Sequence, residues 1–130
     1  MTPSADSLSL WLDSLDSLSL ECDGLTRVIS ALLLRESIDH QVHIGSLEVA
    51  AVGTIPHHWW INLPEGFICD YRARMWLGDG PAVPHGFVLP GSGVQYRTER
   101  KTQDPSSIAL PLGLLSVMAG INLAAYPRLG

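Results

Sequence analysis

The stretch Glu-Cys-Asp-Gly-Leu-Thr-Arg-Val-Ile-Ser-Ala-Leu-Leu-Leu-Arg-Glu, residues 21–36, decides the fold that we expect for this chain. Its apolar side chains recur at steps of three and four, which predicts an amphipathic helix from about Cys22 to Glu36. The predicted buried stripe consists of Leu25, Val28, Ile29, Leu32 and Leu33. Gly24 is unfavourable in a helix interior by about 1 kcal/mol relative to alanine, but near a helix end it allows another segment to approach closely.

From residue 40 the apolar pattern changes to a period of two, which is typical of β-strands. We predict one strand over residues 40–44. Residues 47–52 either continue this strand or pair with it. A His-His-Trp-Trp-Ile-Asn-Leu strand (57–63) and a return strand (67–71) form an antiparallel hairpin around the turn Pro-Glu-Gly. A glycine- and proline-rich connection follows, and a last strand is expected over 94–98.

The chain has 130 residues, which suits a single domain, and its mixture of elements predicts the α+β class. Residues 1–18 hold an amphipathic N-terminal helix over 7–18, which Asp6 is expected to cap. Its apolar face is formed by Leu8, Trp11, Leu12, Leu15 and Leu18. Residues 19–78 form the core of the domain, and residues 79–130 form an irregular segment and an apolar C-terminal element.

Composition excludes several classes of protein. A net charge of −5 with only eight basic residues predicts no nucleic-acid binding. The N-terminus lacks the features of a secretory signal, so we expect a cytoplasmic protein in which Cys22 and Cys69 are free thiols; a disulfide between them is the alternative. No motif for zinc or for phosphate binding is present, so we expect neither a metal nor a cofactor.

Residues 108–125 contain no charged side chain. A continuous helix there would approach the ~30 Å thickness of a bilayer core. Pro111, Gly113 and Gly120 interrupt the segment, which favours a buried core element. A membrane span is the alternative.

The order of Cys, His and Asp along the predicted elements points to thiol chemistry. A free thiol has a pKa near ~8.5 and is a poor nucleophile while protonated. A helix N-terminus and an adjacent imidazolium both lower a thiol pKa, and Cys22 has the first by position. A carboxylate on the paired strand would orient the imidazole and stabilise its charge. These residues predict a catalytic triad of Cys22, His58 and Asp70, although each one alone is more often a packing residue.

Strand parity favours His58 over His57, because His57 shares a face with the core-forming residue Ile61. On the return strand Asp70 and Cys69 point to opposite faces, so we expect Cys69 to be a buried structural thiol.

We expect Trp60, His57 and Arg72 to bind the substrate. The guanidinium of Arg72 suits a substrate carboxylate, which it can bind through two hydrogen bonds. A surface ion pair of Arg72 with Asp79 or Glu65 is the alternative.

Three motifs together carry a resemblance to a known family. The helix at 22–34, the Val-His-Ile-Gly strand at 42–45 and the His-Trp-Trp motif at 58–60 resemble the transglutaminase-like branch of the papain-like fold. The resemblance covers about residues 19–77. It implies a papain-like core, in which a helix that begins with the nucleophilic cysteine packs on a small antiparallel sheet.

The resemblance implies that Cys22 is the nucleophile, His58 the base and Asp70 the residue that orients the base. The chain departs from the family pattern at Asp23, because a carboxylate beside the thiol would raise its pKa unless it pointed to solvent. It departs again at Asn62, where the family often has an acidic residue.

We therefore predict a thiol-dependent acyl-transfer enzyme, a cysteine peptidase or amidase that acts on a peptide or protein through a Cys22 thioester. Water is the expected acceptor, because no amine pocket is evident; a transglutaminase- or deamidase-type activity is one alternative. The other alternative is a non-catalytic interaction module with a tryptophan-rich docking surface. Its anchors would be Trp11, Trp59, Trp60 and Trp76.

Overall fold

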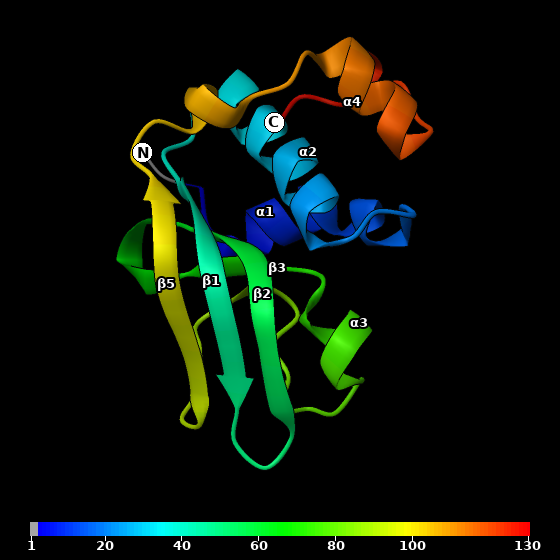
Figure 1. Ribbon diagram of the computed structural model, residues 1–130. Helices are drawn as coiled ribbons and strands as arrows, with labels where there is room; N and C mark the ends of the chain where they lie inside the picture. Colours follow the sequence, from blue (N-terminus) through cyan, green and yellow to red (C-terminus); the bar gives the residue numbers. More distant parts are fainter. Residues whose placement is uncertain (1–2) are drawn as a thin grey trace.

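A five-stranded antiparallel sheet organises the structure, with the strand order β4-β3-β2-β1-β5 (Figure 1). The computed structural model describes residues 3–130, and it confirms the α+β class. The strands are β1 (Gln41–Val49), β2 (Gly53–Asn62), β3 (Ile68–Asp70), β4 (Gly86–Val88) and β5 (Val94–Thr102).

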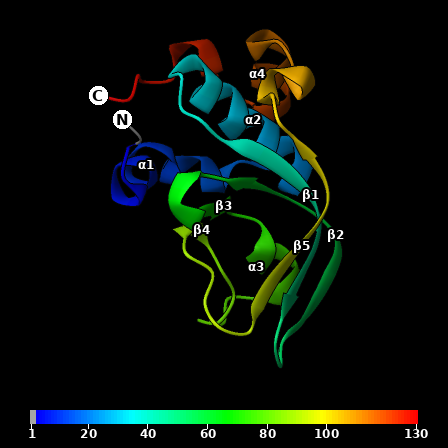
Figure 2. The same cartoon turned by 90° about the vertical axis from the view of Figure 1, so that its left-hand side faces the viewer.

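Helices pack against several strands of this sheet. They are α1 (Ala5–Leu12), α2 (Cys22–Arg35), α3 (Ala73–Leu77) and α4 (Leu112–Ala119), and 3₁₀ turns lie at Asp13–Ser17, Pro64–Gly66, Pro105–Ile108 and Leu123–Ala125. Figure 2 shows α1, α2 and α4 grouped together, while the β1–β2 hairpin extends away from them beside α3.

The prediction for α2 is confirmed. All five residues of its predicted apolar stripe are buried, and they pack against Val42, Ile61 and Cys69 of the sheet. The helix ends at Arg35, one residue earlier than predicted. A Cβ atom on Gly24 would lie 3.2 Å from the side chain of Leu20, so this glycine does allow a close approach in the first turn.

The N-terminal helix is shorter than predicted. The α-helix ends at Leu12, and a 3₁₀ turn continues to Ser17. Its N-cap is Ser4 rather than Asp6, because the Ser4 hydroxyl accepts a hydrogen bond from the backbone N–H of Ser7 at 3.1 Å.

Two strand predictions were incomplete. The strand β2 begins at Gly53, before Pro56, and β5 continues to Thr102. The strand β4 was not predicted, because it is only three residues long and lies within the glycine- and proline-rich connection. Its pairing with β3 gives the sheet a fifth strand.

Residues 108–125 do not form one element. The helix α4 has eight residues, and only Leu115 and Leu123 of the segment are buried, whereas Val117 and Met118 are exposed. The prediction of a buried core element therefore holds for one side of the segment only. Within residues 3–130 no helix has the length and apolar character needed to cross a bilayer.

Candidate active site

The register of β2 and β3 brings His58 and Asp70 together. Ile61 pairs with Cys69, so the next residue along β3, Asp70, points to the face that carries Trp60 and His58. His58 lies two residues beyond Trp60 on that face, which makes it a diagonal neighbour of the carboxylate. The Nε2 atom of His58 lies 2.7 Å from Oδ2 of Asp70, and the two residues are 0% and 3% exposed.

Four donors surround the Asp70 carboxylate. Oδ2 faces the His58 ring and accepts a hydrogen bond from the hydroxyl of Tyr96 at 2.8 Å. Oδ1 accepts from the backbone N–H groups of Arg72 and Ala73 at 3.0 and 3.1 Å. Because hydrogen bonds to the charged form stabilise it, this arrangement holds an oriented carboxylate in a buried position.

Cys22 lies at the first position of α2, where the side chain of Glu21 does not cap the helix. The first N–H groups of the helix have no acceptor within it. Cys22 is a free, half-buried thiol, and it lines the same small cavity as Asp70. The adjacent Asp23 is exposed, so its carboxylate faces solvent rather than the thiol.

One ring nitrogen of His58 remains open. Its Nδ1 atom is buried and has no hydrogen-bond partner among residues 3–130. Since Nε2 is occupied by Asp70, Nδ1 is the atom left for the thiol of Cys22.

The surroundings of His58 favour its protonated form. Burial acts to lower the pKa of His58, but the hydrogen bond and charge of Asp70 and the nearby Cys22 side chain outweigh it and raise the pKa to about 9. An imidazolium beside a thiol at neutral pH is the arrangement that activates a cysteine nucleophile.

Two aromatic residues support this pair. Trp60 packs between His58 and Tyr96, with ring centroids 6.2 and 4.9 Å away, and donates its indole N–H to Asn62. Trp60 is 1% exposed, so the predicted role in substrate binding does not fit its burial. Tyr96 was missed, because its contact with Asp70 depends on the pairing of β5 with β1, for which the local sequence gives no signal.

The other two predicted substrate-binding residues, His57 and Arg72, differ in their exposure to solvent. His57 is exposed, and its substrate role stays a prediction. Arg72 is buried and forms its ion pair with Asp16, rather than with Asp79 or Glu65, so it does not present a guanidinium to a substrate.

Cys69 is buried on the opposite face of β3, as predicted, and burial raises the pKa of its thiol well above the ordinary value, with smaller contributions from Asp70 and Asp13. No group of three His, Cys, Asp or Glu side chains suited to a metal ion occurs in the described part of the chain.

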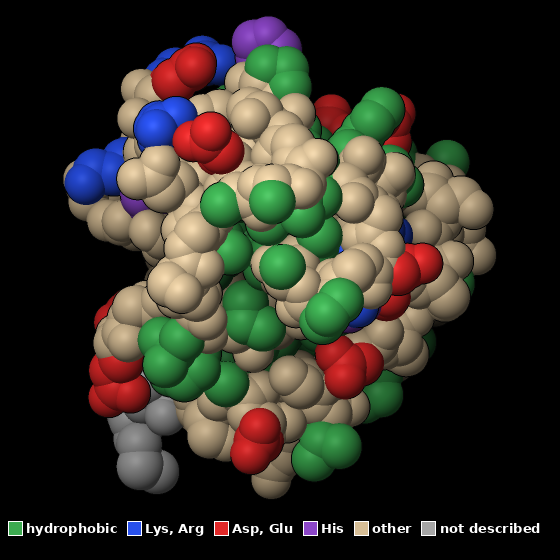
Figure 3. Space-filling model, turned by 90° about the horizontal axis from the view of Figure 1, so that it is seen from below, with side chains coloured by type: hydrophobic (Ala, Val, Ile, Leu, Met, Phe, Trp, Pro, Cys, Tyr) green, Lys and Arg blue, Asp and Glu red, His purple; other side chains and the backbone are tan. Residues whose placement is uncertain are grey.

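The tryptophans do not form a common surface. Trp11 donates a hydrogen bond to the carbonyl of Pro127, Trp59 lies under the guanidinium of Arg27, and Trp60 is buried. Trp76 is exposed. Figure 3, a view from the hairpin end, shows hydrophobic side chains in several groups and basic side chains along one edge. The tryptophan-rich docking surface is thus reduced to one exposed anchor.

Comparison of the chain with protein families, with curated proteins and with solved structures finds no match. The resemblance to the transglutaminase-like branch therefore stays a prediction.

Proposed function

We propose that the protein is a thiol-dependent acyl-transfer enzyme with a papain-like arrangement of Cys22, His58 and Asp70. The observation that carries the proposal is the set of partners around the His58 imidazole. This buried imidazole has one nitrogen on a carboxylate and the other without a partner, and the thiol at the start of α2 lies close enough to raise its pKa.

The first half of the reaction follows from this arrangement. In the resting site the proton of the Cys22 thiol lies on Nδ1 of His58, and the resulting thiolate attacks the carbonyl carbon of an amide. The free N–H groups at the start of α2 stabilise the oxyanion. The imidazolium then returns the proton to the leaving nitrogen, the C–N bond breaks, and an amine leaves while the acyl group stays on sulfur.

The second half uses water as the acceptor. His58 takes a proton from water, the hydroxide adds to the thioester carbonyl, and the C–S bond breaks to give a carboxylic acid and Cys22. Asp70 orients the imidazole and stabilises its charge throughout. The substrate is proposed to be an amide of a peptide or protein, and a reducing compartment such as the cytoplasm would keep the thiol free.

An activated ester tests the proposal without knowledge of the natural substrate. We expect 4-nitrophenyl acetate to give a burst of 4-nitrophenolate and an acetyl group on Cys22, detected by peptide mass spectrometry. Cys22→Ser should abolish both signals, whereas the matched control Cys69→Ser should retain them, because the Cys69 thiol is buried and burial raises its pKa well above the ordinary value. Absence of acetylation at Cys22 in the folded wild type would contradict the proposal.

A further inference from the structure

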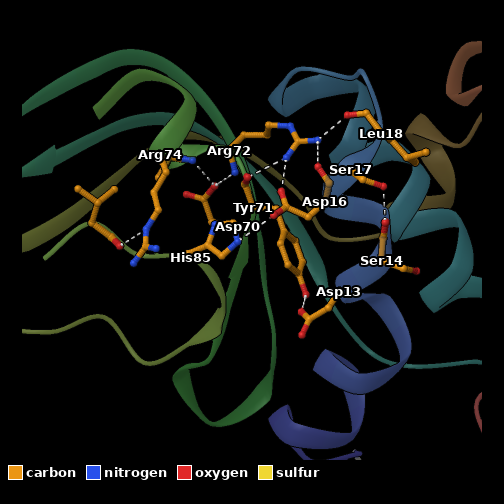
Figure 4. A network of polar contacts seen from close by, with 12 residues as sticks. Asp13, Ser14, Asp16, Ser17, Leu18, Asp70, Tyr71, Arg72, Arg74 and His85 are labelled. Atoms are coloured by element: carbon orange, nitrogen blue, oxygen red, sulfur yellow. Dashed lines mark hydrogen bonds and ion pairs between the residues drawn. The ribbon is translucent and has the colours of Figure 1, made fainter. Parts of the chain in front are cut away.

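The segment that leads into Cys22 is held by one buried arginine. Arg72 follows the catalytic carboxylate by two residues, and its backbone N–H donates to Asp70. Its side chain extends across to residues 16–20, as Figure 4 shows, and its side chain is only 6% exposed.

Every N–H donor of this guanidinium is used. Arginine has five such donors. Nε donates to the carbonyl of Leu20 at 2.5 Å, Nη1 to Asp16 Oδ1 and the carbonyl of Tyr71, and Nη2 to the carbonyls of Asp16 and Leu18. Three of these five acceptors are backbone carbonyls between residues 16 and 20, directly before the nucleophile.

Two further contacts join the same regions. The Tyr71 hydroxyl donates to Asp13 at 2.5 Å, and His85 Nε2 lies 3.1 Å from the second oxygen of Asp16. Figure 4 shows Tyr71, Arg72 and His85 pointing toward Asp13 and Asp16 in the segment before α2. Arg72, which we expected to bind the substrate, thus connects the segment before the thiol with the carboxylate.

We propose that Arg72 is a positioning residue for the acyl-transfer site, which ties the segment before Cys22 to the residues that hold Asp70. The inference rests on the proposed function for its catalytic meaning, but the clamp itself is a structural claim. A point charge with three donors, as in lysine, cannot hold five acceptors in one plane, so Arg72→Lys should loosen the segment.

The test compares Arg72→Lys with Arg74→Lys. Arg74 also donates to a backbone carbonyl, that of Val83 at 3.1 Å, but it does not bind the segment before Cys22. In Arg72→Lys we expect iodoacetamide alkylation of Cys22 at pH 6 to slow by about tenfold, which corresponds to about 1.4 kcal/mol of lost thiolate stabilisation. Amide exchange should become faster over residues 16–22 and not elsewhere, and Arg74→Lys should change neither signal.

A second variant covers the case in which Arg72→Lys does not fold. Asp16→Ala removes one acceptor of the clamp at a partly exposed carboxylate, and we expect smaller changes of the same sign. Wild-type alkylation rate and unchanged amide exchange in these folded variants would overturn the clamp. A wild-type Cys22 with ordinary thiol reactivity would instead remove the proposed function, while amide exchange over residues 16–22 would still decide whether the clamp exists.

Discussion

Two buried histidines in this domain have opposite surroundings. His40, just before β1, is 7% exposed, and its two ring nitrogens contact the hydroxyl of Ser30 at 2.7 Å and the carbonyl of Ile38 at 2.9 Å. Burial is the main cause that lowers the pKa of His40. His58 is buried as fully, yet a carboxylate and a thiol raise its pKa to about 9, against the effect of burial.

The comparison shows that partners, rather than burial, separate a structural histidine from a reactive one. Neutral partners satisfy both ring nitrogens of His40, so neither nitrogen is free to exchange a proton with another group. A charged partner holds one nitrogen of His58 and leaves the other open beside Cys22.

The largest expected effect is on the pH dependence of stability. The pKa of His58 is raised in the folded state, so protonation of His58 adds about 3 kcal/mol to the free energy of unfolding. This stabilisation is fully present below about pH 6.5 and is lost as the pH rises through about 9. The pKa of His40 is lowered in the folded state, so neutral His40 stabilises the fold. This stabilisation is present above about pH 6.5 and is lost as the pH falls.

Urea unfolding of the wild type, His58→Gln and His40→Gln between pH 5 and 10 measures both contributions. The stability gap between wild type and His58→Gln should narrow as the pH rises, and the gap to His40→Gln should narrow as the pH falls. Slopes of the same sign for the two variants would contradict the comparison.

The next largest effect is expected from replacing the Asp70 carboxylate. Asp70→Asn removes the charge that holds the His58 imidazolium, so alkylation of Cys22 at pH 6 should slow by about a hundredfold, equivalent to about 2 pKa units. Asp39→Asn is the matched control, because Asp39 is an exposed carboxylate beside His40. Equal rates in the two variants would show that Asp70 does not act on the thiol.

Local periodicity was enough to predict much of the fold. The stripe of α2 and the alternation along β2 and β3 depend on residues close in the chain, and they placed His58 and Asp70 on one face. The sequence signals failed for β4 and for the break at Leu12, where short elements depend on tertiary pairing and packing. Gly45 shows such pairing, because a Cβ atom there would lie 1.9 Å from the carbonyl oxygen of Arg97 on β5.

The supporting residues of the site were harder to predict than the triad. Tyr96 reaches Asp70 from β5, and Arg72 reaches residues 16–20, so both contacts join segments far apart in sequence. The local motif Tyr-Arg-Ala-Arg does not predict whether the guanidinium of Arg72 is exposed to solvent or hydrogen-bonded to five buried acceptors. Only the packing of the N-terminal segment against β3 decides between these outcomes.

The smallest of the expected effects concerns Tyr96. Tyr96→Phe removes one of the four donors to Asp70, and it should lower the free energy of unfolding by about 2 kcal/mol, as is usual for a hydrogen bond to a charged group. Alkylation of Cys22 should slow less than in Asp70→Asn. Tyr126→Phe is the control, because this hydroxyl donates to the carbonyl of Trp11, and the variant should leave alkylation unchanged.

The most direct test of the central claim is the pH dependence of iodoacetamide alkylation at Cys22, read by peptide mass spectrometry in wild type, His58→Gln and His40→Gln. We expect a wild-type thiol that reacts at pH 6 far faster than a free thiol, a large loss of that rate in His58→Gln, and no loss in the folded His40→Gln variant. A Cys22 that reacts like a free thiol in the wild type, or equally in the two histidine variants, would contradict that claim.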